Sequence, residues 1–221
     1  VPQREFGDEI DPEKSLFWFA YNASKRGITL DIETIEGKKI FKKLVKSADF
    51  VIESSAPGYM AKLGLGYKSL EIIKPGLIMV SISPFGQTGP YRSLKSSDLV
   101  VRALGGRLYS VGDYDRPPVR ISHHSQIYLQ AGVEGAMAAV MALYHRQMTG
   151  EGQYIDLSIQ AAAAQPSDVS WDTRKVVPVR GGQVANVYIQ RVWKCKDGIV
   201  NWVYMPYSTN SPSRNNDFVK W

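Results

Sequence analysis

The stretch from Gln126 to Ser158, QIYLQAGVEGAMAAVMALYHRQMTGEGQYIDLS, constrains the fold of this chain more than any other. Alanine and glycine fill nearly every gap between large apolar residues that recur at helical spacing, namely Val133, Met137, Val140, Met141 and Tyr144. His145 and Arg146 suit the negative end of a helix dipole, and Thr149-Gly150 stops the helix before the strand-like YIDLSI. We therefore expect a helix that is buried on most of its surface.

The small residues of this helix predict a close neighbour. They let another backbone approach, so the helix should lie against a sheet or against a second chain. The polar segment ISHHSQIY leads into its amino end, with Ser125 as the expected N-cap. Ligands of α/β proteins often bind at such helix ends, so this entry is a candidate site.

Strand-like and helix-like segments alternate through the first three quarters of the chain. The expected strands are 28–32, 49–55, 77–83, an edge strand at 107–112, and 154–159. The expected helices are 34–47, 59–63, 68–76 and 96–106, and loops with Pro-Gly or Gly follow two of the strands. This order predicts an α/β fold with a Rossmann-like parallel sheet and flanking helices.

The pattern changes after Ala164. Residues 1–164 are interpreted as a Rossmann-like large-domain portion whose first strand is missing, and 165–185 as a linker. Residues 186–221 are interpreted as the start of a small α+β domain, because alternating apolar residues flank a Lys196-Asp197-Gly198 turn. We expect the chain to be an internal piece of a longer fold.

Composition excludes several functional classes. The net charge of +6 favours anionic partners, but five lysines at helical spacing indicate a solvated helix face, and no aromatic residues interleave with them to stack on bases: Lys38, Lys39, Lys42, Lys43 and Lys46. We expect no nucleic acid partner. No run of about 18 apolar residues predicts a membrane span, and no signal peptide opens the chain, so a cytoplasmic location is expected.

Metal chemistry is not expected either. The single cysteine, Cys195, excludes an internal disulfide and a cysteine-based zinc site. His123 and His124 have no carboxylates at metal-ligand spacing around them. A surface or capping role is the simpler interpretation of these histidines, with use as a general base left open.

Six collinear segments together resemble one known family. They are NASKRGITLDIETIEGKKIF, ADFVIESSAPGYMAKLGLGY, IKPGLIMVSISPFGQTGPY, SDLVVRALGG, ALYHRQMTGEGQYIDLS and CKDG, and they span Asn22 to about Gly198. In this order they resemble the class III CoA-transferases of the CaiB/BaiF type, which include formyl-CoA transferase and benzylsuccinate CoA-transferase. The resemblance implies a Rossmann-type large domain, a small domain and an interlocked dimer.

The same resemblance implies a reaction. Members transfer CoA from an acyl-CoA to a carboxylic acid through an aspartate near the start of the central helix, which attacks the thioester and splits one hard step into easier ones. Counted back from TGEGQ, the position of that aspartate is occupied here by Tyr128. A phenol cannot form a mixed anhydride, and its pKa of about 10 makes it a poor nucleophile.

Other positions are carried over from the family's CoA site. They are Leu30, Ser54, Ser55, Lys62, Leu63 and Lys95, while Asp98 matches an acidic residue near the active site and is a possible auxiliary acid. The serines, followed by Ala56, replace a usual asparagine-aromatic-arginine run. The resemblance implies CoA or acyl-CoA as substrate, with no metal cofactor.

Three hypotheses follow from the missing aspartate. The chain is the aspartate-lacking subunit of a heteromeric transferase, as in benzylsuccinate CoA-transferase, and pairs with a paralogous subunit. Alternatively it is a catalytically silent CoA or acyl-CoA binding protein. In the third hypothesis it transfers CoA in a ternary complex by direct attack of the acid, without an aspartyl intermediate. A homodimer or a heterodimer with a paralogous subunit is expected.

Overall fold

The computed structural model describes residues 16–109, 111–112, 116–120, 125–164, 183–184, 187–188 and 192–201. The chain divides into two compact units, 1–41 and 42–221. The domain boundaries expected at 164 and 185 stay predictions, because residues 165–182 lie outside the described part.

Two helices and an extended segment make up the described part of the first unit. Helix α1 is Leu16–Asn22, and α2 (Ile35–Ser47) begins here and continues into the second unit. Thr34 caps α2, because its Oγ1 accepts a hydrogen bond of 3.0 Å from the Gly37 N–H. The strand predicted at 28–32 is wrong. Those residues are extended or in a turn, and none belongs to the sheets of the described residues.

Three parallel strands form the sheet of the second unit. They are β1 (Phe50–Glu53), β2 (Ile78–Ser83) and β3 (Gln153–Ser158), in that order across the sheet. β2 is central and almost entirely buried, as its apolar run predicts. The parallel pairing confirms the predicted α/β fold with a Rossmann-like sheet.

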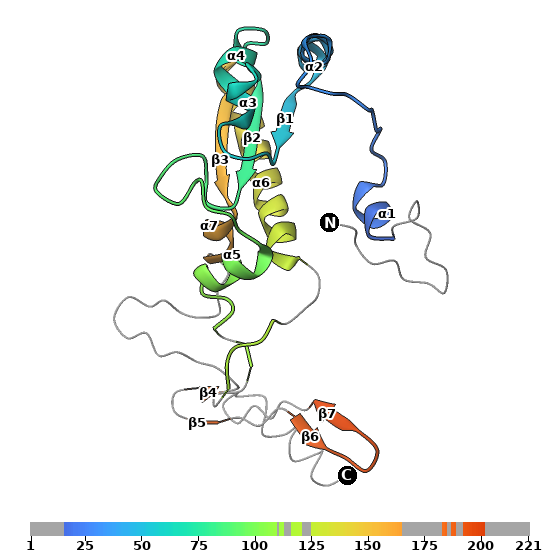
Figure 1. Cartoon of the computed structure of the whole chain (residues 1–221), viewed down its shortest axis with the longest axis vertical. Coiled ribbons are helices and arrows are strands. Elements are labelled where there is room, and N and C mark those ends of the chain that lie inside the picture. Colours follow the sequence, from blue (N-terminus) through green and yellow to red (C-terminus); the bar gives the residue numbers. More distant parts are fainter. Residues whose placement is uncertain are drawn as a thin grey trace. The chain divides into compact units, whose positions relative to one another are not determined.

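Helices connect the strands and cover the sheet (Figure 1). Short helices α3 (Tyr59–Lys62) and α4 (Tyr67–Glu71) lie between β1 and β2 in the sequence. Helices α5 (Asp98–Leu104) and α6 (Gln126–Thr149) lie between β2 and β3, and α7 (Ile159–Ala164) follows β3. An apolar cluster joins α5, α6 and α7 near the carboxyl ends of the strands, formed by Val101, Ile127, Ala131, Ile159, Ala162 and Ala163.

Helix α6 packs on the sheet through its small residues. A Cβ on Gly135 would lie 3.3 Å from Ile82 Cδ1 and 3.7 Å from Leu157 Cδ1, so glycine permits the close approach. The prediction that α6 lies against a sheet is confirmed, and its predicted bounds agree with the structure, since Gly150 ends it with φ of 81°.

Within the single chain, the prediction that α6 is buried on most of its surface is wrong. Its buried positions are Ile127, Ala131, Gly135, Ala139 and Ala142. Its large apolar side chains are exposed instead, by 61% to 71%, and they form what we call the α6 outer face: Val133, Met137, Val140, Met141, Tyr144 and Met148. Among the described residues, α6 alone is long and apolar enough to cross a membrane, a test that core helices also pass.

The edge strand predicted at 107–112 is also wrong where the structure describes it. Residues 107–109 form turns after the Gly105-Gly106 end of α5, and Leu108 N donates to Arg102 O at 3.3 Å. These local bonds satisfy the backbone without a sheet partner.

Two short antiparallel pairs follow, β4 (Gln183–Val184) with β5 (Val187–Tyr188), and β6 (Val192–Lys194) with β7 (Ile199–Asn201). The second pair confirms the hairpin predicted around Lys196-Asp197-Gly198.

Candidate functional site

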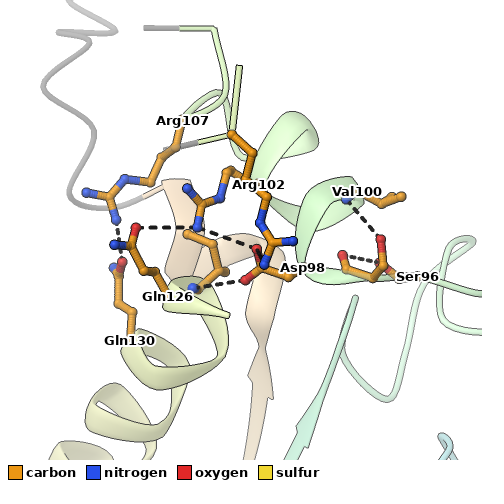
Figure 2. Close-up of polar contacts among 10 residues, drawn as sticks. Ser96, Asp98, Val100, Arg102, Arg107, Gln126 and Gln130 are labelled. Atoms are coloured by element: carbon orange, nitrogen blue, oxygen red, sulfur yellow. Dashed lines mark hydrogen bonds and ion pairs between the residues drawn. The ribbon is translucent and has the colours of Figure 1, made fainter. Parts of the chain in front are cut away.

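A carboxylate from another helix caps the amino end of α6. Ser97 is the N-cap of α5, which places Asp98 in its first turn. Asp98 Oδ1 accepts a hydrogen bond of 3.2 Å from the Ile127 backbone N–H (Figure 2). Ser125 occupies the N-cap position of α6 as predicted, but its side chain makes no capping hydrogen bond. The positive end of α6 is therefore neutralised by a carboxylate of the chain itself.

Two arginines hold this carboxylate. Arg102 lies one turn later on α5, and its Nη2 is 3.4 Å from Asp98 Oδ2, with both side chains at most 6% exposed. Arg120 approaches the same oxygen at 3.7 Å. Arg102 Nη2 also donates to Gln126 Oε1 at 3.4 Å, so the ion pair joins α5 to the first residue of α6 (Figure 2). Two cations therefore flank one anion at the amino end of α6.

The next turn of α6 carries a second polar connection. Arg107 Nη1 donates to Gln130 Oε1 at 2.5 Å, and Gln130 Nε2 donates to Glu134 Oε1 at 3.1 Å and to Ala162 O at 2.7 Å. Gln130 thus joins α6 to α7 and to the segment after α5. The first turns of α6 are therefore fixed on two sides.

Tyr128 stands between these two connections in the sequence and is 40% exposed. Burial raises the pKa of its phenol above the ordinary value of 10.0, and the negative charge of Asp98 raises it further. The phenol is therefore protonated at neutral pH. It can donate or accept a hydrogen bond at this site, but it does not supply an anionic nucleophile.

Asp98 is too buried to act as the nucleophile that the resemblance predicts near the start of α6. Its side chain is 6% exposed and is engaged by two guanidinium groups and a backbone N–H. A carboxylate held in this way is shielded from a thioester in solvent. The geometry gives Asp98 the part of a positioning residue for α6, and its part as an auxiliary acid stays a prediction.

The two loops that follow β1 and β2 are tied together by Gln87. Its Oε1 accepts a hydrogen bond of 3.0 Å from the Gly58 N–H, and its own backbone N–H donates to both carboxylate oxygens of Asp156 at 2.9 Å. The Gly58 bond thus brings the two loops together at the carboxyl edge of the sheet, where ligands of parallel α/β sheets bind.

The positions carried over for CoA fall in three places. Ser54 and Ser55 follow β1 and lead into α3, which contains Lys62 and ends at its C-cap Leu63. Lys95 is exposed in the segment before α5. Leu30 belongs to the other unit of the chain. Four of these positions therefore lie in the single segment that connects β1 to β2. The role of all six in binding CoA stays a prediction.

Sequence reasoning missed most of the polar contacts around α6. The i,i+4 spacing of Asp98 and Arg102 was a usable signal, since oppositely charged residues at this spacing share a helix face. The partners Gln126 and Gln130 gave no such signal, because they meet α5 and α7 only in the folded chain. His123 and His124 lie outside the described residues, within which no group of three potential metal ligands occurs.

Comparisons with known proteins agree on one family. The family model of CoA-transferase family III matches residues 2–214. The chain is 39% identical over 158 residues to succinyl-CoA–D-citramalate CoA-transferase of Chloroflexus aurantiacus, covering 72% of this chain and 39% of that protein. It is 33% identical over 224 residues to the BbsE subunit of succinyl-CoA:(R)-benzylsuccinate CoA-transferase of Thauera aromatica, covering 98% and 52%.

A solved structure supports the same assignment. A CAIB/BAIF family protein from Brucella suis superposes with a TM-score of 0.76 at 31% identity, over 86% of this chain and 52% of that one. The chain spans about half or less of the length of these relatives.

Proposed function

Because the chain belongs to CoA-transferase family III, we propose that it takes part in moving CoA from an acyl-CoA to a carboxylic acid, as the subunit without a nucleophile. One observation carries the proposal. A neutral Tyr128 stands at the amino end of α6, and the carboxylate beside it, Asp98, is buried and paired. The catalytic aspartate would then belong to a paralogous partner chain.

In this proposal the partner performs the covalent steps. Its carboxylate bonds to the acyl carbon and releases CoA thiolate, and the thiolate then attacks the aspartyl carbonyl of the anhydride and releases the first acid. The incoming carboxylate attacks the resulting aspartyl-CoA thioester, expels CoA thiolate and forms a second anhydride. The thiolate then attacks the acyl carbonyl of this anhydride, displaces the aspartate carboxylate and leaves as the new acyl-CoA.

This chain would contribute architecture and a CoA-binding surface. The lysines Lys62 and Lys95 are exposed cations suited to the phosphates of CoA, and Ser54 and Ser55 supply hydroxyl groups beside them in the sequence. Leu63 is a half-buried apolar residue suited to the nucleotide, and Leu30, in the other unit of the chain, stays a predicted contact. The names of two relatives make succinyl-CoA the first donor to test.

The α6 outer face is an argument that the chain has a partner. Six large apolar side chains on one helix leave a continuous apolar surface of a kind that marks protein interfaces. We propose that it is covered in the assembled protein, as a homodimer or with a paralogue. An interlocked arrangement and a cytoplasmic location remain predictions.

Co-expression tests this proposal. The protein is purified alone and with a paralogous subunit, and transfer of CoA from succinyl-CoA to candidate acids is measured. The proposal predicts activity only in the mixture, and full activity of the lone protein would contradict it.

A silent CoA-binding protein is the alternative, since the same lysines would serve binding alone. Calorimetric titration with CoA and several acyl-CoAs would then show binding, with no transfer in any mixture. The third hypothesis, direct attack by the acid in a ternary complex, predicts activity without a covalent acyl-enzyme.

A further inference from the structure

A cavity of about 310 Å³ lies on the face of the sheet opposite α6. Its floor is set by the strand register, which places Met79 beside Tyr154 and, one row on, Glu53 beside Ser81. Residues of α3 and α4 line it as well. Neither Tyr128, Asp98 nor any position carried over for CoA lines this cavity.

Aromatic and thioether surfaces form its walls. The rings of Tyr67 and Tyr154 stack with centroids 5.6 Å apart and an interplanar angle of 28°. The side chains of Met60 and Met79 add apolar, polarisable surface. Flat ring systems pack favourably on such walls, and the volume falls at the small end of the range of ligand pockets.

One buried donor in the cavity lacks a partner. Gln87 Oε1 is engaged by the Gly58 N–H, which fixes the orientation of the amide. Its Nε2 is buried and has no hydrogen-bond partner within the described residues. An unpaired buried donor costs free energy that an acceptor on a ligand would recover.

A carboxylate provides the complementary acceptor. Glu53 lines the cavity, and its Oε2 accepts a hydrogen bond of 2.6 Å from the Ser55 N–H. An ionised carboxylate only accepts hydrogen bonds, so a ligand must bring a donor toward it. Lys68 also lines the cavity, and the two opposite charges together favour an uncharged ligand over an anion or a cation.

We propose that this cavity binds a flat, uncharged nitrogen heterocycle whose edge has an acceptor beside an amino group, as adenine has. The ring lies against the tyrosines, Gln87 Nε2 donates to the ring nitrogen, and Glu53 accepts from the amino group. The proposal stands apart from CoA transfer, because it uses none of the residues assigned to that function. The heterocycle belongs to a free nucleoside, because the positions proposed for CoA lie outside the lining of this cavity.

Three nucleosides test which hydrogen-bonding edge of the heterocycle the cavity recognises. Adenosine is titrated calorimetrically into the full protein, beside purine riboside, which lacks the amino group, and inosine, whose edge exchanges donor and acceptor. Adenosine is expected to bind at a ratio of one to one. The other two should bind at least about ten-fold more weakly, because they leave a buried polar group unpaired. Equal affinities for the three, or no adenosine binding, would overturn the proposal.

Substitutions in the cavity test whether adenosine binds there. Gln87→Glu keeps an oxygen for the Gly58 N–H but removes the donor, and should weaken adenosine binding at least about ten-fold. Tyr67→Ala should do the same, and Tyr67→Phe should restore binding because the ring remains. Tyr144→Ala is the matched control, since it removes a tyrosine from the α6 outer face. Affinity unaffected by both Gln87→Glu and Tyr67→Ala would reject the site.

Saturating CoA tests whether the cavity is separate from the CoA site. Adenosine should bind with unchanged affinity beside CoA. Competition between CoA and adenosine would overturn the proposal. Failure of any of these tests leaves the transfer assay with the partner subunit unaffected.

Discussion

Asp98 Oδ1 lies 3.2 Å from the backbone nitrogen of Ile127 and accepts its hydrogen bond, so a carboxylate of α5 caps the long central helix. This contact fixes the amino end of α6, where the resemblance predicts a nucleophile. It also fills, with a group of the chain itself, the place where a helix would otherwise attract an anion. Tyr128 follows Ile127 directly in the sequence.

Asp98→Asn tests this capping role. The substitution leaves Arg102 buried without its counter-charge, and breaking a buried pair in this way costs about 3 kcal/mol. Urea denaturation should show that loss in the free energy of unfolding. Asp49→Asn is the control, since Asp49 is 61% exposed and pairs with Arg146 at 2.9 Å. It should cost less than about 1 kcal/mol. Equal losses would contradict the role given to Asp98.

Two glycines of α6 should respond in opposite directions to the same change. Gly135→Leu forces a side chain against Ile82 and should lower the melting temperature, because overpacking costs about 1 to 3 kcal/mol. At Gly132 no atom lies within 4 Å of the place a Cβ would take, so Gly132→Leu should raise stability by up to about 1 kcal/mol. Calorimetry on both variants checks this, and a stabilising Gly135→Leu would refute the close packing.

The raised pKa of Tyr128 has a defined sign in the pH dependence of stability. The phenol ionises near pH 10 in the unfolded chain and at higher pH in the folded one, so the folded state holds more protons between these values. Stability is therefore fully present below pH 10 and is lost as pH rises above it. Denaturation at pH 9 and pH 11 should show a smaller loss for Tyr128→Phe, and an identical loss would contradict the shift.

Met141→Glu tests the α6 outer face as an interface. A buried charge would replace a side chain that is 71% exposed in the isolated chain, so association with the partner should be lost. Gln147→Glu adds the same charge at an exposed polar position of the same helix and should leave association intact. Sedimentation velocity of the protein alone and with its paralogue measures both. Unchanged association of Met141→Glu would exclude this face.

The sequence predicts where helices and strands begin and end better than it predicts which face of each is buried. Thr149-Gly150 defines the end of α6, and the apolar run of β2 indicates a strand covered on both sides. The large residues of α6, such as Met137 and Met141, are expected inside, but the small ones face the sheet, because Val80 and Ile82 of β2 already fill that space. Periodicity identifies a face without saying which neighbour it meets.

The site is predictable only where it rests on local spacing. Tyr128 is located by its distance from TGEGQ, and the i,i+4 spacing of Asp98 and Arg102 could have indicated their pairing. The contact of Asp98 with Ile127, 29 residues away, depends on how α5 docks on α6. The orientation of Gln87 likewise depends on two loops that meet only in the folded chain. Such long-range contacts leave no periodic pattern in a single sequence.

Hydroxylamine trapping determines which chain carries the activated carboxylate. The protein and its catalytic partner are mixed with succinyl-CoA, treated with hydroxylamine, and the resulting hydroxamate is located by mass spectrometry. We expect a hydroxamate on the partner and none on this chain. A hydroxamate at Asp98, or an acyl group on Tyr128, would contradict this expectation.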